Sequence, residues 1–258
     1  MYKDELIDLK KFDYEFDLNG FYVLKNILKT SDISKINKIL EKLEKSKDDL
    51  LPKNVFFGKK KRGESYISNI LEADKIFEKL ATTSIILKLI KRTIGNSNLF
   101  RLNHAVAMTK FKKKTYTDLH MGNIPHHPKI FYFVKDKTIF SNITKVLFPV
   151  KNNKIKDGGF AVIPGSHKSN FRRPYNNHPK NNKLLKYIDI GPGDAVIFTE
   201  ALAHGSLENQ SGLTRRILSY AYSVGYMPDW TKLKLSYSDY YLKNAPKKIK
   251  KLISLKKN

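Results

Sequence analysis

The chain has 258 residues, of which 41% are hydrophobic and 12% aromatic, so it can bury a sizeable core and does not resemble a disordered chain. No apolar run approaches the ~20 residues that a membrane-spanning helix needs, and the absence of cysteine excludes disulfides and thiolate metal sites. The net charge of +25 would suit an anionic partner, but only seven of the 49 basic residues are arginine. An A/T-rich coding bias toward lysine, asparagine and isoleucine explains this excess better than nucleic-acid binding. The first residues carry no apolar leader, so we expect a cytoplasmic protein.

The first hundred residues predict one strand followed by helices. Aromatic and β-branched residues around an Asn19-Gly20 turn favour the strand. Isoleucine and leucine at helical spacing favour the first helix, with Thr30 or Ser31 as its cap. The basic run 59–62 is expected to lie in a solvated loop. The predicted elements are a strand over 14–28, helices over 32–46 and about 73–94, and a loop over 49–66.

From about 99 to 225, short β-rich runs alternate with turns, which is typical of an antiparallel sandwich or barrel. A polar excursion covers 165–187. Residues 226–258 form a basic C-terminal extension that is expected to end in a helix. We therefore expect one domain over 1–258, with the first strand and the helices over about 14–98 preceding the β core. The predicted strands are 99–111, 115–121, 130–134, 139–150, 159–163, 194–199 and 216–224.

Two histidines stand in distinctive surroundings. His120 ends a predicted strand, and His204 follows a Gly-Asp turn and an apolar strand. Arg215 lies eleven residues after His204 and opens the last predicted strand. Each histidine alone is more often structural than metal-binding, so the argument depends on the ordered set.

The ordered set resembles the phytanoyl-CoA dioxygenase-like family of non-haem Fe(II), 2-oxoglutarate-dependent oxygenases. Gly-Gly-Phe-Ala-Val-Ile-Pro-Gly-Ser-His-Lys at 158–168 is similar to that family's most recognisable segment. The Gly-Asp run that ends in His-Gly-Ser at 193–206, and the arginine after it, are similar to the family's distal metal ligand and co-substrate anchor. The resemblance extends from about 14 to about 225. It implies a mainly β chain with N-terminal helices and a double-stranded β-helix, or jelly-roll, core.

The resemblance also implies a chemistry. His120 and His204 would bind Fe(II), and Arg215 would bind the distal carboxylate of 2-oxoglutarate, with O₂ as the oxidant. Two imidazoles and a carboxylate leave three iron positions for these co-substrates, and the guanidinium fork matches a carboxylate. Arg216 points to the other face of its strand and ranks second. The implied reaction is oxidation, most simply hydroxylation, of an aliphatic C–H bond in a small molecule.

One position departs from the family pattern. The first ligand pair of the family is His-x-Asp or His-x-Glu, whereas Gly122 stands two residues after His120. Chloride could fill the open position, as in the iron halogenases of this superfamily. Another carboxylate or a water could replace the missing ligand. The site could also be degenerate, in a protein that binds anions or nucleic acid without turnover. The candidate replacement carboxylates are Asp118, Asp157 and Glu200.

Several further residues are candidates for contacts around the site. Asn103, His104 and Ser219 are candidates for lining the 2-oxoglutarate pocket. His167 and Lys168 are candidates for contacting the small-molecule substrate, which the basic charge suggests is anionic. The residues expected to be only structural or solvated are His126, His127, His178, Trp230 and a weakly amphipathic surface helix over 247–257.

Overall fold

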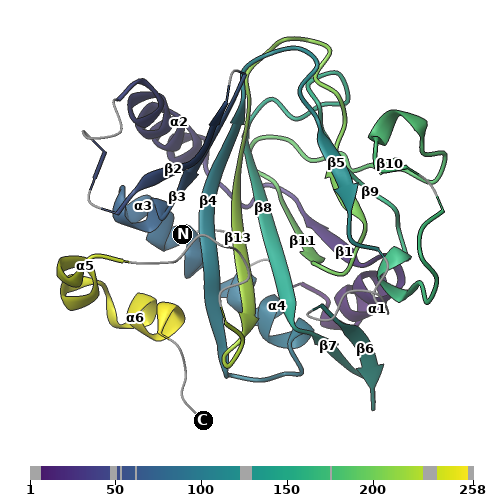
Figure 1. Cartoon of the computed structure of the whole chain (residues 1–258). Helices are drawn as coiled ribbons and strands as arrows, with labels where there is room; N and C mark the ends of the chain where they lie inside the picture. The colour runs from purple at the N-terminus through teal and green to yellow at the C-terminus, as the bar shows by residue number, and fades with distance from the viewer. Residues whose placement is uncertain are drawn as a thin grey trace.

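The computed structural model describes residues 7–46, 51–52, 54–61, 63–122, 130–174, 176–228 and 237–254. Its frame is two antiparallel sheets, with the smaller sheet on the right of Figure 1. The larger sheet contains, in spatial order, β1 (Phe21–Leu24), β11 (Ala195–Thr199), β8 (Ile143–Lys151), β13 (Arg215–Val224), β4 (Phe100–Lys110), β3 (Glu64–Ser68) and β2 (Phe56–Lys61). The smaller contains β10 (Lys186–Tyr187), β9 (Phe160–Val162), β12 (His204–Ser206) and β5 (Thr117–His120). This arrangement confirms the expected jelly-roll core.

Both faces of the larger sheet are covered, which is why its central strands are buried along most of their length. In β13 every residue from Arg215 to Ser223 is buried. One face of the sheet turns toward the smaller sheet. The other face is covered by α2 (Thr30–Lys45), α3 (Lys75–Ala81) and α4 (Ser84–Thr93). The side chains of β13 therefore alternate between an inner cavity and a helix-covered core.

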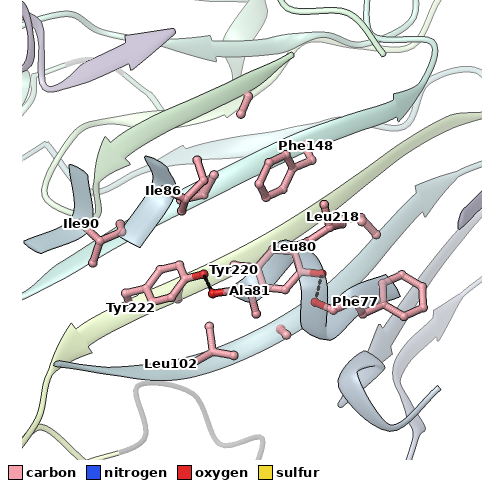
Figure 2. Close-up of a cluster of buried hydrophobic side chains, with 14 of the residues drawn as sticks. Phe77, Leu80, Ala81, Ile86, Ile90, Leu102, Phe148, Leu218, Tyr220 and Tyr222 are labelled. Carbon is pink, nitrogen blue, oxygen red and sulfur yellow. Dashed lines mark hydrogen bonds between the residues drawn. The ribbon is translucent and has the colours of Figure 1, made fainter. Parts of the chain in front are cut away.

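Figure 2 shows the helix-covered core, in which two tyrosines of β13 reach the helices. The Tyr220 hydroxyl donates to the Phe77 carbonyl at 3.1 Å, and the Tyr222 hydroxyl donates to the Ala81 carbonyl at 2.8 Å. The Ala81 carbonyl is the last of α3, where intrahelical partners run out. The two tyrosines thus bury their rings against α3 while their hydroxyls find carbonyl acceptors, and Tyr222 satisfies the helix end.

The strand predicted over 14–28 is wrong in its first half. Residues up to Asn19 belong to α1 (Leu9–Asn19), in which Phe12 and Phe16, four residues apart, share one fully buried face. Asp8 caps the start of α1, and Gly20 ends it with a φ of 82°. The turn was therefore a helix end, and the strand is only β1.

Other boundaries also differ from the predictions. The expected loop over 49–66 contains the hairpin of β2 and β3, so the basic run 59–62 begins inside a strand. The expected helix over 73–94 is two helices, because the Thr82 and Thr83 hydroxyls bond back to carbonyls of α3. The strand over 139–150 divides into β8 and β7 (Thr138–Ser141), and β7 forms a separate two-stranded sheet with β6 (Tyr132–Lys135). The N-cap of α2 is Lys29 rather than Thr30 or Ser31.

The C-terminal residues 237–254 form α5 (Asp239–Asn244) and α6 (Lys247–Ile253). As expected, the extension ends in a helix. α6 buries Ile249, Leu252 and Ile253 and leaves its lysines outward. None of the described helices has the length and apolar character that crossing a membrane would require. Arg62, His126, His127 and Trp230, which the sequence singled out, lie outside the described residues.

Candidate active site

His120 and His204 come together by strand pairing. They are direct partners in the antiparallel ladder of β5 and β12, and their ring centroids are 4.0 Å apart. Cross-strand partners point to the same face of a sheet, and here that face turns toward the larger sheet. His204 is only 5% exposed.

Each ring is oriented by a backbone carbonyl two residues earlier. The Nδ1 atom of His120 lies 2.9 Å from the Asp118 carbonyl, and that of His204 lies 2.7 Å from the Leu202 carbonyl. A carbonyl only accepts, so both Nδ1 atoms carry the proton and both Nε2 atoms keep a free lone pair. Burial lowers the pKa of both histidines, and nearby positive charge lowers that of His204 further. The rings are therefore neutral, as metal ligands must be.

Glu200 completes a cluster with the two histidines. Donor atoms of His120, Glu200 and His204 all lie within 4.8 Å of one another. The Oε2 atom of Glu200 is 4.0 Å from Nε2 of His204 and 2.6 Å from Nζ of Lys145. Two imidazoles and one carboxylate are the donor set of a non-haem iron facial triad.

The other two candidate carboxylates lie elsewhere. The Asp118 side chain is exposed on β5. Asp157 is buried, but its oxygens accept from the Ser211 hydroxyl at 2.7 Å and the Lys154 backbone N–H at 3.1 Å. Of the three alternatives, the structure therefore brings only Glu200 to the histidines.

Gly122 does not open onto the histidine pair. It sits in a turn after β5 with a φ of 75°, and its N–H donates to the Ala201 carbonyl at 3.0 Å. A Cβ on Gly122 would lie 2.4 Å from the Ala203 Cβ. The space that a side chain would enter is thus filled, and Gly122 is not among the residues that line the cavity.

A cavity of about 250 Å³ lies between the sheets beside the histidines. Its walls combine hydrophobic side chains with a concentration of cationic and hydroxyl groups. The polar lining residues are Tyr66, His104, Lys110, Thr117, His120, Lys145, His204, Ser206, Arg215 and Ser219. Drug-sized ligands occupy roughly 300–1,000 Å³, so this chamber suits a smaller molecule.

Arg215 is a buried cation that lines this cavity. Its Nε donates to Asn153 Oδ1 at 2.9 Å, and among the described residues no carboxylate lies within ion-pair distance of it. Burial lowers its pKa to about 10, while Asp157 opposes the shift. A buried guanidinium with unused donors favours a carboxylate ligand. Ser219 lies on the same face of β13 and lines the same cavity.

The remaining candidates fall outside the cavity, apart from His104. Asn103 donates to the Pro228 carbonyl at 3.2 Å. His167 is fully buried, with Nε2 donating to the Asp17 carbonyl at 2.9 Å, and Lys168 pairs with the Asp17 carboxylate at 2.8 Å. His178 is half-buried and accepts from the Lys180 N–H at 3.1 Å. The structure therefore gives His167 and Lys168 contacts with α1, and substrate contact by these two residues stays a prediction.

Sequence reasoning missed Lys145, Lys110 and Tyr66. A lysine in a strand usually marks a solvent face, so nothing singled out Lys145 within the predicted strand 139–150. Its neighbours in sequence, Thr144 and Val146, are both fully buried. A charged residue inside a mostly apolar strand is the sequence signal that could have indicated a functional role for Lys145. Burial and the charge of Glu200 raise the pKa of Tyr66 to about 12.

A jelly-roll core that holds two histidines and a carboxylate beside a buried arginine defines the class of non-haem iron, 2-oxoglutarate-dependent enzymes. The chain matches the family model "Phytanoyl-CoA dioxygenase (PhyH)" over residues 16–217, and it belongs to that family. No curated protein sequence matches the chain.

Solved structures share this fold at low sequence identity. HygX from Streptomyces hygroscopicus, solved with nickel, 2-oxoglutarate and hygromycin B bound, superposes with a TM-score of 0.71 at 19% identity, over 88% of this chain and 90% of that one. SnoN, a non-haem α-ketoglutarate-dependent epimerase from nogalamycin biosynthesis, gives a TM-score of 0.63 at 14% identity, over 90% and 89%. SnoK, a carbocyclase from the same biosynthesis, gives 0.59 at 14% identity, over 87% of each chain.

Proposed function

We propose that the protein is an Fe(II)- and 2-oxoglutarate-dependent enzyme that oxidises an aliphatic C–H bond of a small molecule. The observation that carries the proposal is the cluster of His120, Glu200 and His204, whose two histidines line one cavity with Arg215. The family membership and the metal and 2-oxoglutarate bound to HygX support it.

The donor set suits iron. His120 and His204 would supply their Nε2 atoms and Glu200 one carboxylate oxygen, because the backbone carbonyls already hold both Nδ1 protons. Bound there, iron would supply the activation of O₂ that breaks the C–H bond. The chain's own part is to keep both imidazoles neutral and oriented and to exclude water from the chamber.

The other polar residues that line the cavity suit 2-oxoglutarate. The Arg215 guanidinium would bind the distal carboxylate, and the hydroxyls of Ser219 and Ser206 line the same space. The Lys110 ammonium, which lies 2.9 Å from Ser206 Oγ, adds positive charge to the cavity. The dianion 2-oxoglutarate therefore meets positive charge in the cavity. The cavity volume of about 250 Å³ leaves little room for a bulky substrate beside it.

The substrate would approach from the other side of His120. There, a polar groove of about 550 Å³ is lined by Arg172, Arg173, Asn176 and Asn177. Arg173 donates to the carbonyls of Leu119 and Met121, on either side of His120, at 3.0 and 3.1 Å. Arg172 is exposed in the groove and suits an anionic group. Arg172→Ala should weaken binding of an anionic substrate and leave 2-oxoglutarate binding unchanged.

Hydroxylation is the simplest outcome of C–H oxidation and is the one we propose. SnoN and SnoK carry out epimerisation and ring formation on the same fold, so the substrate and its placement decide the outcome. Halogenation was the alternative raised by Gly122. The contact between Gly122 and Ala203 does not favour it.

The test is an anaerobic titration of metal-free protein with Fe(II) and 2-oxoglutarate, monitored by the visible charge-transfer band of the chelate. The wild type should develop the band, and Glu200→Gln should lose it. Asp118→Asn is the matched control, because Asp118 is an exposed carboxylate beside His120 that lies outside the cluster. The proposal fails if the wild type develops no band, or if Asp118→Asn removes it as completely as Glu200→Gln.

A further inference from the structure

Lys145 is a buried ammonium at the metal cluster to which the proposed chemistry gives no role. It lies in the middle of β8, between β11 and β13, and its side chain is 13% exposed. Strand register places it level with His104, on the other side of Ala221. The small side chain of Ala221 leaves these two polar residues to face the same cavity.

The ammonium engages the carboxylate that would bind iron. Nζ of Lys145 lies 2.6 Å from Oε2 of Glu200, and this is the same oxygen that lies 4.0 Å from Nε2 of His204. The side chain of Glu200 is only 2% exposed. A carboxylate so deeply buried needs a cationic partner, and Lys145 supplies one in the absence of metal.

The charges of the cluster therefore cancel before any metal arrives. Two neutral imidazoles contribute nothing, and the negative charge of Glu200 is balanced by the positive charge of Lys145. A divalent cation that binds Glu200 must approach a fixed positive charge in a desolvated chamber, where like charges repel more strongly than in water. The co-substrate, a dianion, would offset this repulsion when it binds beside the metal.

We propose that Lys145 is an internal cation that competes with the divalent metal for Glu200 and so weakens metal binding until 2-oxoglutarate is present. The inference rests on the proposed function, because it takes the His120–Glu200–His204 cluster to be a metal site. It makes Lys145 a positioning residue that couples the two ligands. A purely structural ion pair would have no such coupling.

The test is a calorimetric titration of metal-depleted full-length protein with Ni(II), first without and then with saturating 2-oxoglutarate. Lys145→Met should bind Ni(II) about tenfold more tightly than the wild type without 2-oxoglutarate, which corresponds to about 1.4 kcal/mol. The gain in Ni(II) affinity on adding 2-oxoglutarate should be smaller in Lys145→Met than in the wild type. Lys145→Gln keeps a polar partner for Glu200 without the charge and serves if Lys145→Met does not fold.

Lys151→Met is the matched control. Lys151 lies on the same strand, and its Nζ is 3.3 Å from Glu41 Oε1, outside the cavity. The variant therefore removes the same charge and one ion pair without touching the cluster. Its Ni(II) affinity should equal that of the wild type.

The outcomes separate the two proposals. If the wild type binds Ni(II) and folded Lys145→Met or Lys145→Gln binds it equally or more weakly, the inference about Lys145 is overturned and the metal site stands. An equal gain in Lys151→Met overturns it too, because net charge then explains the effect. If only the Lys145 variants bind Ni(II), even with saturating 2-oxoglutarate, the coupling to 2-oxoglutarate is overturned and the wild-type chain is not a metalloenzyme. If no variant and no wild type binds Ni(II), both proposals are overturned.

Discussion

Arg215 and Arg216 are neighbours on one strand, are both buried, and face opposite sides of the larger sheet. On the helix side, Arg216 donates to Glu44 Oε2 at 2.6 Å and to Asn37 Oδ1 at 2.7 Å, both on α2. On the cavity side, Arg215 has one hydrogen bond, to the neutral Asn153, within the described part of the chain. The two guanidinium groups thus differ in role, and their partners distinguish them. A buried charge that already forms an ion pair stabilises the fold, whereas one without an ion-pair partner indicates a ligand.

The same contrast extends over the two faces of the sheet. On the helix side, the buried hydroxyls of Tyr220 and Tyr222 each have a carbonyl acceptor. On the cavity side, the Nδ1 atom of His104 is buried without a hydrogen-bond partner, and burial lowers the pKa of His104 to about 3. Most buried polar groups are hydrogen-bonded, so this nitrogen of His104 is available to a molecule in the cavity.

Arg216→Ala should produce the largest effect, on stability. It leaves the Glu44 carboxylate, whose side chain is 8% exposed, buried without its cation. Breaking a buried pair in this way costs about 3–5 kcal/mol. Urea unfolding of the metal-free protein measures the loss, with Arg215→Ala as the comparison variant. An equal or larger loss in Arg215→Ala would contradict the division between the two faces.

Removing a histidine of the cluster should produce the next largest effect, on metal binding. His120→Ala and His204→Ala should each weaken Ni(II) or Fe(II) binding by about a hundred-fold or more, since loss of even an outer-shell partner costs roughly 10–100-fold. Circular dichroism should show that both variants remain folded. His178→Ala, which removes a histidine outside the cavity, is the control and should bind metal normally.

Arg215→Ala should weaken 2-oxoglutarate binding by about ten- to a hundred-fold. A charge-assisted bond of this kind contributes about 1.5–3 kcal/mol, and ~1.4 kcal/mol is a factor of ten. Titration of 2-oxoglutarate into the Ni(II)-loaded protein measures it. The folded fraction of Arg216→Ala should bind 2-oxoglutarate almost normally, and a reversed order would exchange the roles of the two arginines.

Gly122→Asp should fail to restore metal binding to Glu200→Gln. The aspartate would have to displace Ala203 and to adopt a φ of 75°, which side chains rarely tolerate. Metal titration of the double variant is the measurement, with thermal melting to show that it has folded. Restored affinity would mean that position 122 does reach the metal.

The smallest effect we expect is that of chloride. Because the space beside Gly122 is filled by Ala203, added chloride should change neither the spectrum of the Fe(II)–2-oxoglutarate complex nor its affinity beyond a matched nitrate control. A chloride-specific shift in the wild type would reopen the halogenase alternative.

The β core was predictable from sequence because strands such as β4 and β13 carry long β-rich runs, whereas α1 was not. Its Phe12 and Phe16 are four residues apart, but the aromatic residues that follow them made the whole stretch look extended. Strands β10 and β12 were missed because two and three residues are too short to show any alternation. Pairing partners, and not local preference, define them.

The residues of the candidate site also differ in how far the sequence could predict them. His120, His204 and Arg215 stood out because each occupies a marked place in a motif, although their roles stay predictions. Glu200 was one of three carboxylates, and only the turn after β11 brings it to the histidines. Lys145 carried almost no signal, because its burial depends on which strands flank β8 in the finished sheet.

The segment that made the family recognisable begins beside the cluster, where Val162 pairs with His204, but its end lies at the first helix. His167 and Lys168, at its end, are held by Asp17 of α1, whose side chain also accepts from the Tyr132 hydroxyl at 2.7 Å. The end of the motif thus connects the first helix to the barrel. A related chain that had lost every metal-binding side chain would still need this contact to fold. A sequence search based on the motif would therefore find active and inactive members of the family alike. Positions 120, 200 and 204 are where the two would differ.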